Sequence, residues 1–274
     1  MGKENLHVEE RKEKEKDFHG RRESDRLKLD GDSFERIYSN MKFYSVVRKR
    51  TEFLSDWMQE HCHGRIALDY CCGNGGVSLE LVKHGAFVYG IDISEEAVRS
   101  AQRRLGESGL AERCKFAVMD AEHLEFSDDF FDIIVCSGVL HHLDLQYAYP
   151  EIARVLKPGG KVICIEALGY NPVIRWYRRR TPHLRTEWEV DHILTLRDVR
   201  RGGKYFSRIE TRFFHLFSIL GVPLRETLLF EPVLTFLEGI DSLILRIPWV
   251  QLLAWQMVFV FSGKKNVDMV DQRR

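Results

Sequence analysis

Glycines gathered around one asparagine form the most distinctive short segment of the chain, ALDYCCGNGG from Ala67 to Gly76. Gly73, Gly75 and Gly76 carry no Cβ, so the backbone there can approach a ligand closely. In an open parallel sheet, the loop after the first strand is where the backbone comes closest to a bound nucleotide. The composition of this segment is compatible with a phosphate cradle, a metal knuckle, a redox cysteine pair or the floor of a nucleoside pocket.

The neighbouring residues disfavour several of these uses. The run from Gly73 reads GNGGVS and has Ser78 where a dinucleotide loop has its third glycine, which disfavours a nicotinamide cofactor. Cys71 and Cys72 are adjacent and have no second cysteine pair at ligand spacing, so no metal site is predicted. A disulfide between neighbouring cysteines would be strained, and we interpret both as small apolar fillers of the turn.

Acidic residues lie at the ends of three successive predicted strands, beside the glycine loop. Asp92 ends the strand in VYGIDIS, where a carboxylate can accept both ribose hydroxyls. Asp120, in VMDAEHL, can accept from an adenine amino group, and Asp69, just ahead of the loop, can meet an ammonium group. Any one of these acids could equally be a turn residue, but the three together favour a nucleoside site.

Two histidines and a glutamate are the candidates for proton transfer. His141 and His142, in GVLHHL, follow the fourth predicted strand, and a histidine can take a proton near neutral pH. Either histidine could instead only hydrogen-bond the loop or a cofactor. Glu166 ends the fifth predicted strand and is a weaker candidate. Tyr44, on a helix ahead of the glycine loop, could cover a substrate, with core packing as the alternative.

The elements that must position these residues follow from hydrophobic periodicity. From about His61 to Leu168 short apolar runs alternate with helical segments, which is typical of a doubly wound, mostly parallel α/β sheet. Five strands are predicted in this part, at RIALDYC, FVYGIDI, CKFAVMD, FFDIIVCSG and KVICIEAL. Two more, at RIETRFFHLFS and WQMVFVFSGK, bring the sheet to seven strands.

Composition divides the chain into four segments. Residues 1–17 are mostly Lys, Glu and Arg and bury too little apolar surface to become ordered, so a mobile tail is predicted. Residues 18–62 carry apolar side chains at helical spacing and should form one or two amphipathic helices that act as a lid. We assign residues 63–168 to the ligand-binding core, and residues 169–274 to a part that completes the sheet, adds a C-terminal helical lid and forms the substrate pocket.

The overall composition is that of an ordinary globular protein. Among 274 residues, 41 basic ones balance 41 acidic ones, so nothing global indicates nucleic acid or an anionic membrane as a partner. Six cysteines, paired in spacing only at Cys71-Cys72, and a charged first segment predict free thiols in the cytoplasm. The most apolar run, from Ile247 to Phe261, is too short to span a membrane and is interpreted as core, with a peripheral membrane contact as the alternative.

Four stretches, ALDYCCGNGG, VYGIDIS, VMDAEHLEFSDDFFDIIVCSGVLHHL and EIARVLKPGGKVICIEAL, resemble the class I S-adenosylmethionine-dependent methyltransferases, and among them the ubiquinone/menaquinone-methyltransferase-like type 11 group. The resemblance covers about residues 65–168 and implies a Rossmann-like sheet with S-adenosylmethionine as cofactor and S-adenosylhomocysteine as product. It also favours His141 over His142 as the base, because related methyltransferases often carry a histidine at this place. The cofactor contacts it implies are Asp69, Gly73 and Gly75 for the methionine part, Asp92 with Ile93 for the ribose, Asp120 with Ala121 for the adenine, and Ser137 for the sulfonium.

The acceptor pocket is predicted in the segment after Tyr170. Its aromatic side chains suit a small lipophilic acceptor such as an isoprenoid, a quinone or an aromatic natural product, although core packing would also explain most of them. If the acceptor were an isoprenoid alkene, methylation at carbon would give a carbocation that aromatic faces stabilise. The arginines of RWYRRR, from Arg175 to Arg180, could hold a phosphate or carboxylate or form a solvated basic face. The aromatic residues concerned are Trp176, Tyr177, Phe213, Phe214, Phe217 and Phe230.

Three functions remain open on these grounds. The first is an S-adenosylmethionine-dependent methyltransferase with a small lipophilic acceptor. The second is a nicotinamide-dependent oxidoreductase on the same sheet, and the third is a non-catalytic module that keeps the cofactor fold. The amphipathic helix before the sheet must bury its apolar face, which makes a homo-oligomer an option through exchange of that helix between subunits. No nucleic-acid partner is predicted.

Overall fold

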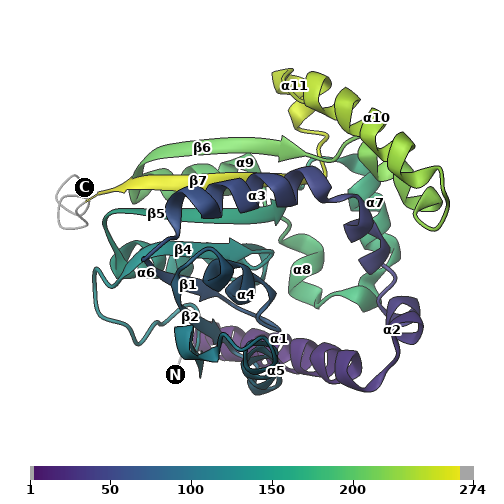
Figure 1. The fold of residues 1–274 in the computed structure, drawn as a ribbon. Helices are drawn as coiled ribbons and strands as arrows, with labels where there is room; N and C mark the ends of the chain where they lie inside the picture. Colours follow the sequence, from purple (N-terminus) through teal and green to yellow (C-terminus); the bar gives the residue numbers. More distant parts are fainter. Residues whose placement is uncertain (1–2, 266–274) are drawn as a thin grey trace.

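The computed structural model describes residues 3–265, and its centre is a seven-stranded sheet (Figure 1). The strands are β1 (Ile66–Tyr70), β2 (Phe87–Asp92), β3 (Cys114–Val118), β4 (Phe131–Ser137), β5 (Leu156–Ala167), β6 (Phe206–Phe214) and β7 (Gln256–Lys264). Their order is β3-β2-β1-β4-β5-β7-β6; the first five are parallel, and β7 runs antiparallel to both of its neighbours. The predicted doubly wound, mostly parallel sheet of seven strands is confirmed.

Helices cover both faces of the sheet. On one face lie α3 (Arg48–His61), α4 (Gly76–Lys83) and α5 (Glu95–Glu107), and on the other lie α6 (Leu145–Val155) and α9 (Leu196–Arg201) (Figure 1). Each face has its own apolar core, with Trp57 and Leu81 in one and Tyr149 and Phe261 in the other. Because both faces are covered, β1 and β4 are buried along most of their length, which is why they read as continuous apolar runs.

Local sequence signals set the starts of the helices that follow the strands. Ser94 caps α5 by accepting a hydrogen bond from the Ala97 N–H at 3.3 Å. Asp144 caps α6 in the same way, by accepting from the Gln146 N–H at 3.0 Å. These caps fix the ends of two strand-to-helix loops, and the predicted site residues lie on such loops.

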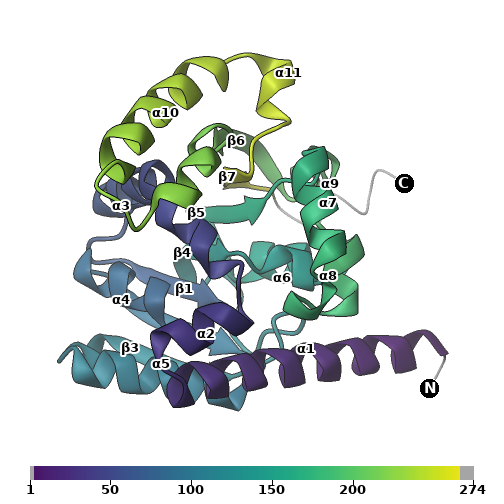
Figure 2. The ribbon, with the colours of Figure 1, turned by 90° about the vertical axis from the view of Figure 1, so that its right-hand side faces the viewer.

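The remaining helices stand mostly around the edge of the sheet where the parallel strands end, the edge that faces the viewer in Figure 2. They are α1 (Lys3–Lys28), α2 (Gly31–Ile37), α7 (Pro172–Arg180), α8 (Glu187–Asp191), α10 (Phe230–Ile244) and α11 (Pro248–Gln251). Short 3-10 helices connect the elements: η1 (Met41–Val46), η2 (Ala111–Arg113), η3 (Leu140–His142), η4 (Pro182–Leu184), η5 (Gly202–Lys204) and η6 (Ser218–Leu224). Helices from both ends of the sequence thus surround this edge, while the division of the chain into domains stays a prediction.

The first helix corrects the prediction of a mobile tail at residues 1–17. α1 is unbroken and lies along α5 (Figures 1 and 2). Ion pairs hold it in place of apolar contacts: Arg11 contacts both carboxylate oxygens of Glu122, at 2.5 and 2.7 Å, and Lys12 contacts Asp120 at 2.7 Å. Charged side chains are rarely buried alone but can be buried in pairs. A segment without apolar periodicity can therefore still pack against the core.

The apolar run from Ile247 to Phe261 is only partly core, contrary to the prediction. Its second half forms the buried centre of β7, but Pro248 begins the short helix α11, where the Trp249 side chain is 83% exposed. Proline is favoured at the first position of a helix and here starts a segment outside the sheet. No helix within residues 3–265 is both long enough and apolar enough to cross a bilayer.

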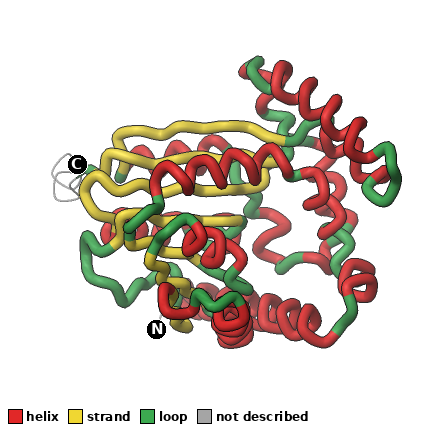
Figure 3. The backbone as a smooth tube through the Cα atoms, in the orientation of Figure 1, coloured by secondary structure: helices red, strands yellow, loops and turns green. Residues whose placement is uncertain are grey.

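The segment predicted to form amphipathic helices, residues 18–62, contains the end of α1 followed by α2, η1 and α3 (Figure 3). α3 buries Trp57 and Met58 against the sheet of its own chain. The apolar face that suggested exchange between subunits is therefore covered within the chain, and a homo-oligomer stays a prediction without that support.

Candidate functional site

The glycine loop connects β1 to α4 with backbone angles that few residues adopt. Cys71, Gly73 and Gly75 have φ values of 61°, 49° and 72°. A Cβ on Gly75 would lie 2.9 Å from the Cβ of Ala101 on α5, so this glycine is needed for packing. Nothing lies within 4 Å of the place that a Cβ on Gly73 would take. Gly73 therefore faces open space and can contact a ligand, whereas Gly75 supports the loop from behind.

Asp92, at the end of β2, holds this loop in place. One carboxylate oxygen accepts a hydrogen bond from the Gly73 N–H at 3.0 Å, and the other accepts from the Ser94 N–H at 2.9 Å. Each oxygen of a carboxylate has more than one lone pair, so both can still accept from a ligand. Asp92 and Ile93 line a cavity at the place where the sequence predicts a ribose.

Asp69 is a buried carboxylate near the end of β1. The Ser78 hydroxyl donates a hydrogen bond to it at 2.6 Å, and within residues 8–265 no Lys, Arg or His side chain forms an ion pair with it. Burial raises the pKa of Asp69 to about 7, because the charged form is poorly solvated there. A ligand cation would supply the charge that this carboxylate lacks, in agreement with the predicted contact to an ammonium group.

Asp120 and Ala121 follow β3. Asp120 accepts a hydrogen bond from the Glu122 N–H at 2.9 Å, and its other oxygen lies 2.7 Å from Lys12 Nζ of α1. Burial alone would raise the pKa of Asp120, but these donors outweigh it and lower that pKa. The acid predicted to accept from an adenine amino group thus already has a cation from α1 beside it.

Two adjoining cavities, about 260 and 200 Å³, form what we call the strand-end cleft. Helix α1 forms part of the wall of both cavities, and Gly75 lines neither of them. The predicted cofactor residues that line the cleft are Asp69, Gly73, Asp92, Ile93, Asp120, Ala121 and Ser137. Residues that the sequence places far apart, from before the sheet to the end of β4, therefore meet at one edge of the sheet.

A cavity of about 510 Å³, which we call the acceptor pocket, adjoins the cleft. Ser137, at the end of β4, lines both the cleft and this pocket. Tyr44 of η1 lines the pocket too, with its ring 5.9 Å from the ring of Trp255. Of the six aromatic residues predicted for the pocket, three line it and three pack in apolar clusters instead. Those in the wall are Trp176, Tyr177 and Phe217, and those in the clusters are Phe213, Phe214 and Phe230.

Glu166, in the wall of this pocket, is fully engaged with the protein. One oxygen accepts hydrogen bonds from the Val139 and Leu140 N–H groups at 2.9 and 2.7 Å, and the other lies 2.7 Å from His141 Nδ1. Burial alone would lower the pKa of His141, but Glu166 and Glu189 outweigh it and raise that pKa to about 9. His141 therefore carries a proton at neutral pH, which disfavours it as a base.

His142 is the less basic of the two histidines. Its pKa is lowered, first by burial and then by the neighbouring charge of His141. Its Nδ1 lies 2.9 Å from a carboxylate oxygen of Glu15 on α1. A proton on Nδ1 satisfies that contact and leaves a lone pair on Nε2. Because His142 lines both the cleft and the acceptor pocket, it is the better placed of the two to accept a proton.

Four residues around His142 are also of the types that bind metals. Glu15, His19, His142 and Glu189 each offer one ligand atom, and these atoms lie within 4.8 Å of one another. In the structure Glu15 contacts both histidines, at 2.9 and 3.4 Å. Burial would raise the pKa of Glu15, but the two histidines lower it to about 2. Hydrogen bonds among these side chains account for the cluster, and the absence of a metal stays a prediction.

Sequence reasoning missed the residues that α1 brings to the site. They recur every three or four positions, which places them on one face of a helix. Apolar periodicity, the usual sign of a packed helix, is absent from this segment. The spacing of its charged side chains along one helical face was the signal that could have identified them. The residues are Arg11, Glu15, His19, Arg22 and Arg26. Arg50, Arg185 and Glu189 of the acceptor pocket were also missed, and no motif in the sequence marks them.

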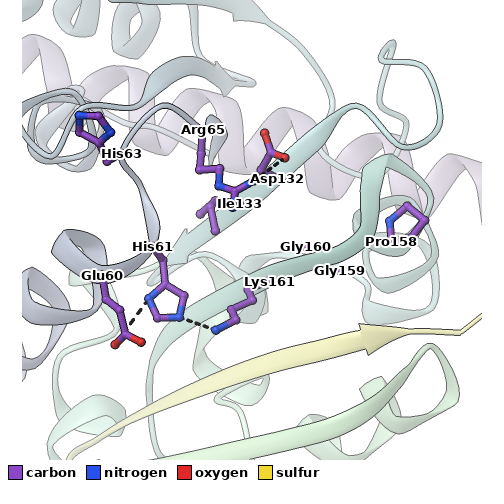
Figure 4. Close-up of a pocket in the computed structure, with 10 residues that line it drawn as sticks. All are labelled: Glu60, His61, His63, Arg65, Asp132, Ile133, Pro158, Gly159, Gly160 and Lys161. Atoms are coloured by element: carbon purple, nitrogen blue, oxygen red, sulfur yellow. Dashed lines mark hydrogen bonds and ion pairs between the residues drawn. The ribbon is translucent and has the colours of Figure 1, made fainter.

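A larger cavity, about 580 Å³, lies at the opposite edge of the sheet (Figure 4). Its lining includes Arg65, just before β1, and Asp132 and Lys161, near the starts of β4 and β5; Lys161 contacts His61 across it. Ligands of doubly wound sheets bind at the carboxyl ends of the strands, and this cavity lies at the other end. None of the predicted site residues lines it. Volume alone therefore does not identify the site.

Comparisons with known proteins agree with this geometry. Residues 68–164 match a family described as "Methyltransferase domain". A demethylmenaquinone methyltransferase from Geobacillus sp. (strain WCH70) is 30% identical over 160 residues, 53% of this chain and 68% of that protein. The sterol 4-C-methyltransferase strm-1 from Caenorhabditis elegans is 33% identical over 112 residues, 40% of this chain and 32% of that protein. The chain spans about a third of the length of that protein and about half that of a Lactiplantibacillus plantarum demethylmenaquinone methyltransferase.

The fold is similar to that of a solved structure, the geranyl diphosphate C-methyltransferase from Streptomyces coelicolor A3(2). The TM-score is 0.55, over 78% of this chain and 79% of that chain. At 16% identity this likeness concerns the fold alone, and it confirms the Rossmann-like architecture. Taken with the matched family and the relatives above, it shows that the chain belongs to the class I methyltransferases, whose cofactor is S-adenosylmethionine.

Proposed function

We propose that this protein transfers the methyl group of S-adenosylmethionine to a small lipophilic acceptor. The observation that carries the proposal is the position of Ser137, which lines the strand-end cleft and the acceptor pocket at once. Methyl transfer is an in-line displacement, so the cofactor and the acceptor must meet at one point in a fixed orientation. A strand end shared by two cavities provides such a point, and Ser137 is proposed to face the sulfonium there.

The residues of the cleft fit S-adenosylmethionine in charge and in space. Asp69, a buried carboxylate, suits the ammonium group, and the open space beside Gly73 suits a methionine part that lies close to the backbone. When bound, the cofactor supplies a methyl group on a positively charged sulfur, and the chain orients it and excludes water. The other proposed contacts are Asp92 with Ile93 for the ribose and Asp120 with Ala121 for the adenine.

On the acceptor side we propose His142, in place of His141, as the base when the acceptor loses a proton. The lowered pKa of His142 and its free Nε2 support this role, and the raised pKa of His141 opposes it. His141 and Glu166 are proposed as positioning residues that hold the loop after β4. Tyr44 is proposed to cover the acceptor. A general base contributes about 10²–10⁴-fold to a rate, so H142Q should lower kcat far more than H141Q.

Calorimetric titration with S-adenosylhomocysteine, with NADH as the control, tests the proposal first. We expect micromolar binding of S-adenosylhomocysteine and no binding of NADH. Transfer of a labelled methyl group to prenylated, quinone and phenolic acceptors is then measured. Binding of NADH alone would instead support the nicotinamide-dependent oxidoreductase. Binding of S-adenosylhomocysteine without transfer to any acceptor would support the non-catalytic module.

The remaining proposals concern the acceptor atom and the partners. Carbon is proposed as the methylated atom because a relative is named as a sterol 4-C-methyltransferase. A cytoplasmic location is proposed because the cysteines are free thiols, and a nucleic-acid partner is not expected because the basic and acidic residues of the sequence balance. Peripheral contact with a membrane is proposed for exposed apolar side chains of α10 and α11, since such side chains insert into the interface of a bilayer. These are Phe236, Leu243 and Trp249.

A further inference from the structure

Three arginines in the wall of the acceptor pocket form no ion pair with a carboxylate of residues 8–190 or 192–265. They are Arg50 of α3, Arg178 of α7 and Arg185, which follows η4. Arg178 donates to the backbone carbonyl of Glu189 at 2.6 Å, and Arg185 donates to that of Thr181 at 2.7 Å. In this part of the chain, the hydrogen-bond acceptors of Arg178 and Arg185 are therefore neutral oxygens.

A neighbouring arginine of α3 shows the contrast with a paired guanidinium group. Arg48, two positions before Arg50 on the same helix, contacts Glu238 at 2.5 Å and Glu231 at 2.8 Å. In contrast, the Nε atoms of Arg50 and Arg178 are buried and have no hydrogen-bond partner in the described part of the chain. A buried donor without a partner costs about 1–3 kcal/mol. Such a cost at two neighbouring positions of one pocket calls for a ligand that removes it.

The three guanidinium groups line one pocket, together with Tyr44. Burial lowers the pKa of all three, that of Arg178 to about 10, and the charge of Arg185 adds to the effect on Arg178. Glu189 acts in the opposite direction on Arg178 and Arg185 without reversing the effect of burial. All three cations thus belong to the pocket that we propose Tyr44 covers.

The carboxylates of the pocket are engaged by other groups and offset these charges only in part, through the attraction of Glu189 for Arg178 and Arg185. Glu166 is engaged by two backbone N–H groups and His141, and Glu189 accepts a hydrogen bond from the Thr186 N–H at 3.2 Å and lies 3.5 Å from His142. Four arginines, Arg22 among them, and these two carboxylates line the pocket. Its wall therefore carries an excess of positive charge.

Besides these charged residues and several polar ones, the pocket wall carries many apolar side chains. A wholly apolar acceptor would bury the arginines further without giving them a partner, which is costly for a charged group. A small inorganic anion would leave the apolar wall in contact with water. A ligand with an apolar body and an anionic end satisfies both parts of the wall. The apolar residues include Phe43, Ile174, Leu184, Leu216, Ile219 and Trp255.

We propose that the acceptor is an amphipathic anion, whose phosphate or carboxylate head group binds to Arg50, Arg178 and Arg185. This inference rests on the proposed methyltransferase function and narrows its substrate class. Guanidinium groups suit the role because their planar donors match the oxygens of phosphate and carboxylate. Of the arginines in RWYRRR, Arg178 lines the pocket, while the others are exposed and form the solvated basic face that the sequence also allowed.

Octyl phosphate is the probe for this proposal, titrated by calorimetry into the protein saturated with S-adenosylhomocysteine. Octanoate distinguishes a carboxylate head group from a phosphate, octan-1-ol supplies the apolar body alone, and inorganic phosphate supplies the head group alone. We expect octyl phosphate or octanoate to bind at least about tenfold more tightly than octan-1-ol, because a hydrogen bond to a charged group is worth about 1.5–3 kcal/mol. Inorganic phosphate should bind weakly.

Two pairs of variants locate the effect. R178Q and R50Q should each lose about tenfold in affinity for the anionic probe, and R178K should lose less than R178Q. R179Q and K49Q, which change exposed residues beside them on the same helices, should bind as the unchanged protein does. Thermal unfolding confirms that every variant is folded.

The possible results distinguish a failure of this inference from a failure of the proposed methyltransferase function. If S-adenosylhomocysteine binds but octyl phosphate and octanoate bind no better than octan-1-ol, the inference is wrong and the methyltransferase proposal stands. An equal loss in R179Q and R178Q would also overturn it, because a general surface charge would then explain the binding. If S-adenosylhomocysteine does not bind, the proposed function itself fails.

Discussion

The strand-end cleft and the acceptor pocket meet at Ser137 but differ in how their charged side chains are partnered within the protein. In the cleft, Asp92 is bonded to two backbone N–H groups and Asp120 lies beside Lys12 of α1. In the pocket, Arg50 and Arg178 form no ion pair with a carboxylate of residues 8–190 or 192–265. Asp92 and Asp120 thus have partners before the ligand arrives, although Asp69 of the same cleft still lacks a cation, whereas the arginines of the pocket hold charge that their ligand must neutralise.

This difference determines what a substitution does in each region. Removing an acid from the cleft releases backbone donors, so binding and stability should fall together. Removing an arginine from the pocket takes away a charge that destabilises the empty protein, so binding should fall while stability rises. Four substitutions or conditions, from the largest expected effect to the smallest, test this contrast.

The largest effect is expected for R11A, which removes the cation that closes the cleft from α1. The Glu122 side chain is fully buried, so the variant leaves a carboxylate with a weakened set of partners. Breaking a buried ion pair costs about 3–5 kcal/mol, and urea unfolding should show a loss of that size. K14A, on the exposed side of α1, is the matched control and should change little. If neither R11A nor K14A changes the free energy of unfolding, the result would instead support the mobile tail predicted from the sequence.

A second test is the dependence of stability on pH through His141. The folded pKa of about 9 lies above the ordinary value of 6.5, so the stabilisation is complete below pH 6.5 and is lost as the pH rises through 9. The free energy of unfolding should fall by up to about 3 kcal/mol over that range, since one pKa unit corresponds to about 1.36 kcal/mol. H141Q should remove this fall, and H183Q, at an exposed histidine, should keep it. Equal curves for H141Q and the unchanged protein would contradict the assignment.

D92A tests the organised cleft directly. The loss of the acceptor for the Gly73 and Ser94 N–H groups should weaken binding of S-adenosylhomocysteine about 100-fold and also lower the melting temperature. E95A, at an exposed acid on the first turn of α5, should leave calorimetric binding unchanged. Weaker binding with an unaltered melting temperature would show that the loop does not depend on Asp92.

The smallest effect, and the one of opposite sign, is expected for R50M. Replacing an unpaired, half-buried cation by an apolar side chain of similar length should raise the free energy of unfolding by about 1 kcal/mol, because the desolvation cost disappears. K49M, one position earlier on the surface, serves as the control in thermal unfolding. A loss of stability in R50M would mean that Arg50 has a structural partner, and the contrast between the two regions would fail.

The same contrast explains how much the sequence alone could predict. The strands and the glycine loop follow one another in a fixed order, and the acids at strand ends lie at one edge of any parallel sheet. Asp69, Asp92 and Asp120 were therefore predictable once the strands were. The preference for His141 over His142 was not secure, because the pKa of each depends on Glu166, Glu189 and Glu15, which lie far away in the sequence.

The acceptor pocket and α1 were beyond sequence reasoning for a related reason. The pocket takes Arg50 from before the sheet and Arg178 and Arg185 from after β5, and no repeating pattern connects these positions. α1 is attached by charged pairs such as Arg11 with Glu122, and charge patterning alone is also typical of a disordered tail. In both cases the role of a residue depends on partners that are distant in the sequence and come close only in the folded chain.

The position of β7 in the sheet also bears on how the chain folds during synthesis. Among the strands of residues 3–265, β6 pairs only with β7, yet β7 begins at Gln256, well after β6 ends at Phe214. At about 5–20 residues per second, the ribosome needs several seconds to make the intervening segment. During that time β6 and the exposed edge of β5 have no partner in the growing chain. The nascent protein therefore passes through a stage in which its sheet has open edges, and protection of those edges by chaperones would matter most then.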